Sequence, residues 1–305
     1  MPHSHHPPAP LASRLRVLAA AALFSTGGAA IKAISLNAWQ VACLRATVAA
    51  VALFLLVPEA RRRPPLRVLA ISLCHALTMV LFVQSNKLTT SASAIFLQAT
   101  APLWVLLLAP WLLKERTRRS DLVTMGVIAA GLGLFFVSID HASETAPNPA
   151  LGNLAAIASG AFWSFTLMGM RWAGRRDEGD ETASWGPVAA LGGNVLAALI
   201  TLPFAAPFPS VPGKDVFLLL YLGAIQIALA YVFLLRGLEE VPAFQASLLL
   251  LLEPVLNPIW SWIVHGETPG PWALAGGILI LAATILKAWV DSRALSRAQR
   301  RAGPG

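Results

Sequence analysis

The stretch VPAFQASLLLLLEPVLNPIWSWIVHGE, residues 241–267, decides the fold. It is apolar and long enough to cross a bilayer, because about 20 helical residues rising about 1.5 Å each span a hydrocarbon core of about 30 Å. Yet Glu253 and Pro254 stand in its middle. A carboxylate and a helix breaker at membrane depth are tolerated where they line a cavity rather than lipid. The stretch therefore predicts a transmembrane helix that is kinked at Pro254 and Pro258 beside a substrate cavity.

A second copy of this pattern lies upstream, in SASAIFLQATAPLWVLLLAPWLLKE, residues 91–115. Pro102 and Pro254 are separated by 152 positions, and so are Glu115 and Glu267. The constant offset predicts an internal duplication, with Pro102 as a kink equivalent to Pro254.

Composition places the chain in a membrane class. Of its 305 residues 56% are hydrophobic and only 12% are charged, and the mean hydropathy is +0.66. Soluble proteins carry about 25% charged residues. The apolar residues fall in long blocks, which predicts an all-α polytopic membrane protein with ten transmembrane helices. The expected spans are 15–33, 38–57, 67–86, 91–113, 121–139, 151–170, 185–205, 215–236, 242–264 and 271–290.

Basic residues predict the orientation of these spans. Lys32, Lys87 and Lys214 fall on one side, Arg45 lies inside the second span, and all other Lys and Arg residues fall on the other side. The positive-inside rule then predicts that both termini are cytoplasmic. Five spans in each half make the two repeats inverted. The expected organisation is a disordered cytoplasmic tail (1–13), a first repeat (14–140), a linker (141–150), a second repeat (151–290) and a basic cytoplasmic tail (291–305).

Several other functional classes lack support in the sequence. The net charge of +8 lies at the ends of apolar blocks without a nucleic-acid-binding motif, so no nucleic-acid partner is expected. Cys43 and Cys74 lie inside spans, which argues against a disulfide, and the His-rich start supplies no closed metal-ligand set. The absence of H-E-x-x-H, G-x-S-x-G, C-x-x-C and P-loop motifs argues against an enzyme, a cofactor and direct ATP drive. A channel would need a continuous polar lining, whereas the polar residues here cluster at mid-depth.

Glu253 is the first candidate for a role in transport. Burial disfavours its charged form, so this carboxylate could couple transport to protons, or it could pair with a cationic group of the substrate. The alternative is a hydrogen-bonded glutamate that only stabilises the kink. Asn257 and Trp260 extend the same helix face at i+4 and i+7.

Further candidates for substrate binding lie in other spans. Thr100 and Trp104 share a stripe on the fourth span, Trp163 lies on the sixth, and His75 lies on the third. Aromatic rings with a few polar groups suit a largely apolar pocket, although core packing explains each of them equally well. Arg45 could attract a substrate carboxylate or could extend toward the membrane surface.

Residues at span ends and on small-residue faces suggest structural roles. Glu115 and Glu267 are expected to cap or gate through contacts with the next helix rather than to bind substrate. Small residues at helical spacing predict that the fifth and tenth spans pack closely as scaffold, and a homodimer contact there stays open. These small residues are Gly126, Ala130, Gly133, Ala273 and Gly277.

At this point several motifs resemble the drug/metabolite transporter superfamily, in its branch with paired EamA domains. Residues 91–116 and 126–137 resemble its fourth and fifth spans, and residues 243–267 and 273–286 resemble its ninth and tenth. FSTGGAAIK resembles a first-span motif that usually begins with Trp, where Phe24 stands here, and AFWSFTLMG keeps Trp163 at the matching place in the sixth span. CLRATVAA resembles a second-span segment that contains Arg45.

The resemblance covers most of residues 15–290 and implies a function. It implies a ten-span secondary transporter of the bacterial inner membrane, with a substrate cavity between the halves. Relatives of this kind mostly export amino acids or other small metabolites by alternating access. Some import vitamins or nucleobases, which is the alternative on the same fold.

Overall fold

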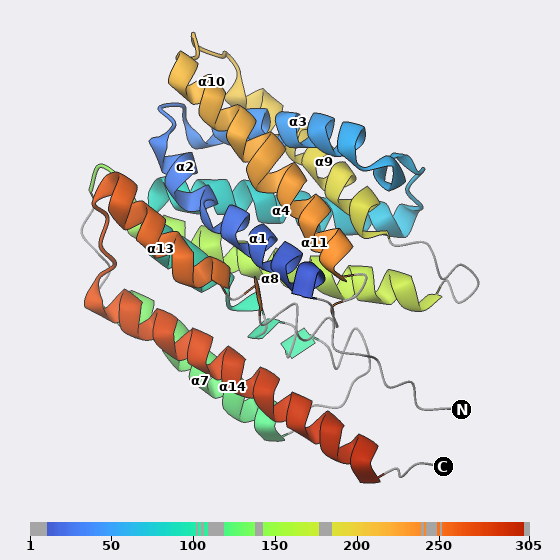
Figure 1. Cartoon of the computed structure of the whole chain (residues 1–305). Coiled ribbons are helices and arrows are strands. Elements are labelled where there is room, and N and C mark those ends of the chain that lie inside the picture. Colours follow the sequence, from blue (N-terminus) through green and yellow to red (C-terminus); the bar gives the residue numbers. More distant parts are fainter. Residues whose placement is uncertain are drawn as a thin grey trace.

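The computed structural model describes residues 11–101, 103, 104, 107, 108, 119–137, 143–176, 185–238, 241, 249, 250 and 252–301. Nearly all of these residues are helical (Figure 1). The helices are α1 (Leu11–Ser25), α2 (Gly27–Ala33), α3 (Ala38–Leu56), η1 (Pro58–Arg61), α4 (Leu66–Leu88), α5 (Ser91–Gln98), α7 (Arg119–Val137), α8 (Pro149–Arg176), α9 (Gly186–Ala205), α10 (Gly213–Leu220), η2 (Tyr221–Leu229), α11 (Ala230–Leu238), α13 (Leu252–His265) and α14 (Pro271–Arg301).

Helix α4 forms the centre of the packing. It lies against α8 and α9, and α3 also packs against α9. Helices α7 and α14 lie side by side as a pair along one side of this group (Figure 1). The core includes Ile31, Leu97 and Leu222, which are fully buried and come from the first, fourth and eighth predicted spans. The two halves of the sequence therefore share one core.

Several helices are suited to a bilayer by length and composition. Within the described residues, five helical stretches are long and apolar enough to span it, and two shorter ones are apolar. The five are Leu11–Ala33, Ala38–Leu56, Leu66–Leu88, Gly186–Ala205 and Gly213–Leu234, and the two are Leu122–Val137 and Pro271–Lys287. The polytopic all-α class agrees with this finding, and the count of ten stays a prediction.

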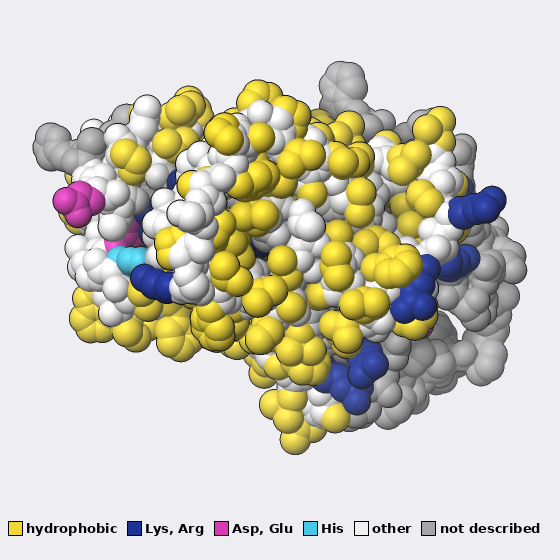
Figure 2. Space-filling view, turned by 90° about the horizontal axis from the view of Figure 1, so that it is seen from above, with side chains coloured by type: hydrophobic (Ala, Val, Ile, Leu, Met, Phe, Trp, Pro, Cys, Tyr) yellow, Lys and Arg dark blue, Asp and Glu magenta, His cyan; other side chains and the backbone are white. Residues whose placement is uncertain are grey.

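The surface also fits a lipid environment. Figure 2 shows a face whose middle is covered by hydrophobic side chains, while Lys and Arg side chains gather toward its ends. Large apolar side chains are widely exposed, including Leu66, Phe217 and Trp262. A water-soluble monomer seldom exposes an apolar patch of more than about 600 Å², so a face of this kind is explained by acyl chains.

The first predicted span, 15–33, is helical apart from a single turn residue at Thr26, which we call the break. The backbone of Thr26 keeps helical angles (φ −76°, ψ −11°), and its N–H donates to Leu23 O at 3.2 Å, a tighter i−3 bond. The Thr26 hydroxyl also donates to Leu23 O, and the Ser25 hydroxyl donates to Ala22 O, each at 2.7 Å. Hydroxyls bonded to nearby carbonyls bend helices, and the glycines that follow are poor helix formers. The sequence SerThrGlyGly thus explains the break locally.

The eighth predicted span, 215–236, contains a π-helical segment. Helices α10, η2 and α11 follow one another without a gap, and η2 covers nine residues, Tyr221–Leu229. π-helical turns are rare and often occur at functional sites. The wider turn changes which side chains share a face, so α-helical spacing does not predict the direction of Gln226.

Two prolines of the ninth predicted span lie in helix α13. Helix α13 is described from Leu252, and Pro254 and Pro258 both belong to it. Residues 249 and 250 are helical as well, and residue 251 lies outside the described residues. The kink at Pro254 stays a prediction. Pro102, the predicted equivalent of Pro254, lies outside the described residues.

Helical structure extends into both predicted tails. Helix α1 begins at Leu11, inside the tail that was expected to be disordered over 1–13. Helix α14 continues to Arg301, although its apolar part ends near Lys287. Residues 291–301 of the predicted basic tail are therefore helical.

Helices α7 and α14 cross through glycines other than the expected ones. A Cβ added at Gly276 would lie 2.6 Å from Gly131 O, and one added at Gly131 would lie 3.0 Å from Gly276 O. Gly126 and Gly133, which the spacing favoured, have nothing within 4 Å of an added Cβ. Gly277 lies against Phe96 of α5 instead. The backbone contact explains the close pairing of these two helices.

The close approach of α7 and α14 predicts that a larger side chain at the crossing destabilises the protein. We expect Gly276→Val to destabilise the protein by about 1–3 kcal/mol, because its side chain would collide with backbone and must force α7 and α14 apart. The measurement is the thermal unfolding midpoint in detergent. Gly133→Val on α7 is the matched control and should leave the midpoint unchanged, and equal midpoints for both variants would contradict the proposed crossing.

Candidate functional site

The π-helical segment contacts the break in the first span. The Tyr221 hydroxyl lies 2.8 Å from the Thr26 hydroxyl, and Gln226 Nε2 donates to Phe24 O at 3.2 Å. A Cβ added at Gly27 would lie only 2.8 Å from Gln226 Nε2. Glycine at this position therefore lets the amide of Gln226 approach the backbone of the break.

Helix α13 contacts the same break from another side. Trp260 Nε1 donates to the Ser25 hydroxyl at 2.9 Å. The Asn257 carboxamide faces Gly28, since an added Cβ there would lie 2.9 Å from both Asn257 Nδ2 and Oδ1. The face predicted from the spacing of Asn257 and Trp260 is thus directed at the first span.

Arg45 lies at the centre of the bundle with an incomplete set of partners. It is buried, and its Nη2 donates to Gln226 Oε1 at 3.1 Å. Its Nε and Nη1 are buried without a hydrogen-bond partner. A small pocket is lined by Arg45, Asn194, Met79 and six apolar or small residues: Ala42, Ala46, Val80, Val83, Ala197 and Ile227. A buried cation with free N–H groups beside a cavity is suited to an anionic ligand.

Glu253 is an acidic residue that acts on Arg45. Its carboxyl group and the Arg45 guanidinium interact electrostatically. Within the described part of the chain they do not approach to within 4 Å as an ion pair. Glu253 lies partly buried on α13. The centre therefore combines a basic and an acidic side chain that are not directly paired.

An aromatic group adjoins these charges. The His75 ring is fully buried between Trp163, with ring centroids 6.1 Å apart, and Tyr231, at 5.9 Å with an edge-on geometry. Both ring nitrogens of His75 lack a hydrogen-bond partner. Tyr231 also packs edge-on against Phe24 at 5.6 Å, which connects the aromatic group to the break.

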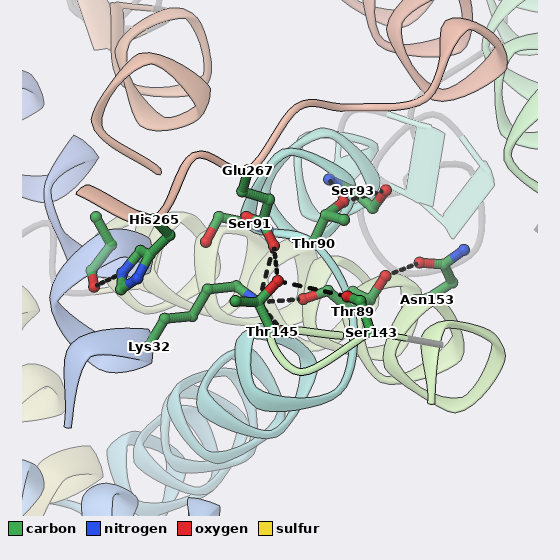
Figure 3. A network of polar contacts seen from close by, with 11 residues as sticks. Lys32, Thr89, Thr90, Ser91, Ser93, Ser143, Thr145, Asn153, His265 and Glu267 are labelled. Atoms are coloured by element: carbon green, nitrogen blue, oxygen red, sulfur yellow. Dashed lines mark hydrogen bonds and ion pairs between the residues drawn. The ribbon is translucent and has the colours of Figure 1, made fainter. Parts of the chain in front are cut away.

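One end of the bundle is closed by a buried ion pair (Figure 3). Lys32 Nζ lies 3.1 Å from Glu267 Oε1, and the two side chains are only 2% and 5% exposed. Glu267 Oε2 accepts from the backbone N–H of Ser91 at 2.9 Å, and Oε1 accepts from the Thr145 hydroxyl at 3.2 Å. Lys32 also donates to Thr89 O at 2.7 Å and to Thr145 O. We call these five residues the Lys32 mouth.

Backbone geometry positions Glu267 in this mouth. Gly266 ends α13 with a φ of 65°, a conformation that favours glycine. The partners of Glu267 lie on α2, on the first turn of α5 and in the 143–146 turn, rather than on the next helix as expected. A carboxylate at the N-terminal N–H of a helix is favourably placed for the helix dipole.

Other contacts join the halves at the same end. His265 lies 2.9 Å from Ala29 O, and the Asp215 carboxylate accepts from Ser35 N at 2.9 Å. Both bring the second half of the chain onto the end of the first span or the loop after it. The Lys32 end is therefore sealed by buried polar contacts.

The structure brings some predicted residues together and leaves others apart. Arg45, His75 and Trp163 are joined through Gln226, Phe24 and Tyr231, while Asn257 and Trp260 meet the break directly and Glu253 is linked to Arg45 by charge. Thr100 donates to Leu97 O of its own span, and Trp104 Nε1 is buried without a partner. Glu115 lies outside the described residues.

Sequence reasoning missed four contributors to this site: Gln226, Tyr231, Asn86 and Lys32. A signal existed for Gln226, which is a carboxamide within an otherwise apolar stretch. The sequence analysis used Lys32 only to predict the orientation of the spans in the membrane. Its pairing with Glu267 joins positions 235 residues apart, which local patterns cannot predict.

Comparison with known proteins shows similarity to transporters over most of the chain. The chain is 28% identical over 281 residues to a "Probable terminal-alkyne amino-acid exporter" of Streptantibioticus cattleyicolor, covering 89% of this chain and 91% of that protein. It is 27% identical to the "Uncharacterized inner membrane transporter YicL" of Salmonella typhimurium, covering 78% and 77%. A crystal structure shares the fold with a TM-score of 0.60 and 20% identity, covering 93% of this chain and 98% of that one.

The family model for the EamA-like transporter family matches twice, over residues 14–139 and 150–288. The two matches follow the two halves that the offset of 152 positions separates. The described helices are apolar at the surface and carry a buried polar centre, as a membrane transporter requires. This chain belongs to the EamA-like transporter family.

Proposed function

We propose that this protein exports amino acids or closely related small metabolites across the bacterial inner membrane by alternating access. The observation that carries the proposal is the group of buried polar atoms without partners around the break in the first span, which includes two nitrogens of Arg45. Buried polar groups are normally hydrogen-bonded, and an unpaired one costs about 1–3 kcal/mol. A polar ligand in this centre would supply the missing hydrogen-bond partners and so remove that cost.

The chemistry of the centre supports an amino acid as the ligand. The Arg45 guanidinium is suited to a carboxylate, and the Glu253 carboxylate is suited to a cationic group or to a coupling proton. The aromatic group of His75, Trp163 and Tyr231 offers an apolar surface to a side chain. The relative named as a probable amino-acid exporter agrees with this assignment.

The proposed architecture is ten transmembrane helices in two inverted repeats, 14–140 and 151–290, with both termini in the cytoplasm. In this arrangement the Lys32 mouth faces the outside and is closed. Export then requires that the second half withdraw from the end of the first span, which breaks the Lys32–Glu267 ion pair. In this proposal transport uses no catalytic residue and no cofactor.

A second candidate keeps the fold and reverses the direction. The ring of His75 between Trp163 and Tyr231 also suits a planar ligand, as a vitamin or a nucleobase would be. Import of such a compound is the alternative. Counterflow into liposomes against a panel of amino acids, nucleobases and vitamins separates the two candidates, because only one class should exchange.

Arg45 provides the first test of amino-acid export. We expect Arg45→Lys to raise the KM for amino-acid counterflow about tenfold or more, because hydrogen bonds to charged groups contribute about 1.5–3 kcal/mol and lysine cannot match the planar guanidinium. The exposed Arg236→Lys is the control and should behave as the wild type. An unchanged KM in Arg45→Lys would remove this residue from the site.

Glu253 provides the test of proton coupling. In proteoliposomes we expect Glu253→Gln to abolish the flux driven by a pH gradient while counterflow without a gradient persists, because glutamine cannot bind and release a proton. The exposed Glu59→Gln should retain both activities. If pH-driven flux survives in Glu253→Gln, this carboxylate is not the proton carrier.

The Lys32 mouth provides the test of alternating access. In a Cys43→Ala, Cys74→Ala background, a cysteine at the buried position Ser93 should react with maleimide at least about tenfold faster after Lys32→Met, because losing one partner of a buried ion pair costs about 3–5 kcal/mol. The exposed Lys214→Met is the control lysine. The double variant Lys32→Met, Glu267→Gln should react more slowly than the single variant. Wild-type reaction rates in Lys32→Met would contradict a gating role.

A further inference from the structure

Two fully buried carboxamides converge beside the break in the first span. Asn86 of α4 and Asn257 of α13 are both 0% exposed. A Cβ added at Gly28 would lie 2.9 Å from Asn86 Oδ1, Asn257 Oδ1 and Asn257 Nδ2. These three atoms have no hydrogen-bond partner. The sequence analysis assigned Asn257 to substrate binding and did not identify Asn86.

The orientation of Asn86 is fixed by its own helix. Its Nδ2 donates to Phe82 O at 2.9 Å, and a carbonyl oxygen can only accept. The amide oxygen is therefore the atom that faces Gly28. A buried acceptor without a partner calls for a hydrogen-bond donor from a ligand.

Arg45 carries free groups of the opposite kind. It donates to Gln226, whose carboxamide lies against Gly27, while Asn86 and Asn257 lie against the next residue, Gly28. The free groups of Arg45 are N–H donors with positive charge, and those at Gly28 are two amide oxygens and the amide nitrogen of Asn257. A ligand that complements Arg45 and the two amide oxygens carries an anionic acceptor and an N–H donor. The carboxylate and primary ammonium of an α-amino acid provide these two groups.

We propose that Asn86 and Asn257 bind the ammonium group of the transported amino acid, while Arg45 binds its carboxylate. This inference rests on the proposed export of amino acids and adds a selection rule. The transported molecule must carry a free primary ammonium group. The two carboxamides bind this group through their oxygens, without a buried negative charge. Glu253 is then left free for coupling.

The experiment compares ligands with and without the ammonium group. Dissociation constants are measured by titration calorimetry on the purified full chain, with L-phenylalanine and L-leucine against 3-phenylpropanoate and 4-methylpentanoate. We expect the wild type to bind the amino acids at least about tenfold more tightly than the acids. Asn86→Leu and Asn257→Leu should weaken amino-acid binding about tenfold and leave binding of the acids unchanged.

Two further variants separate a binding role from a structural one. Asn257→Asp keeps an acceptor at the site and should retain the preference for the amino acids. Arg45→Lys should weaken both kinds of ligand by the same factor, because both carry the carboxylate. Equal losses for both ligand kinds in the Asn→Leu variants, or a wild type without preference, would overturn the ammonium site while amino-acid export stands. Absence of both binding and counterflow for every amino acid would overturn the proposed function itself.

Discussion

The break at Thr26 in the first span is the constraint on which the rest of the site depends. A regular helix bonds its backbone polar groups internally, so a polar site at mid-membrane depends on side chains and on local irregularities such as this one. Ser25 and Thr26 turn their hydroxyls onto the preceding carbonyls, and Gly27 and Gly28 let other side chains approach the backbone. The second half of the chain then contacts this segment from Phe24 to Lys32.

The polar groups along this segment differ in whether they have hydrogen-bond partners. At the Lys32 mouth, Lys32 and both oxygens of Glu267 are bonded to partners, which makes the closed end stable despite its buried charges. At the centre, atoms of Arg45, Asn86 and Asn257 lack partners. The buried charges of the Lys32 mouth are thus paired, whereas the buried polar atoms at the centre are available to a ligand in the transport cycle that we propose.

The surrounding helices hold this arrangement in lipid. Helices α7 and α14 approach through Gly131 and Gly276 and lie beside the bundle rather than around the polar centre (Figure 1). The π-helical segment directs Gln226 to both Arg45 and Phe24, and so ties the second half to the break. The helix pair α7 and α14 and the polar centre around Arg45 are therefore built from different spans.

The sequence by itself determined the membrane class, the duplicated halves and the candidates Arg45, His75, Trp163, Asn257 and Trp260, because apolar length, an offset of 152 positions and isolated polar residues are local features. Only the tertiary structure decided how they meet. It replaced Gly126 and Gly133 by Gly131 at the helix crossing, and it paired Lys32 with Glu267. These contacts join residues from spans that are far apart in the sequence. The pattern of residues within a single span therefore cannot predict them.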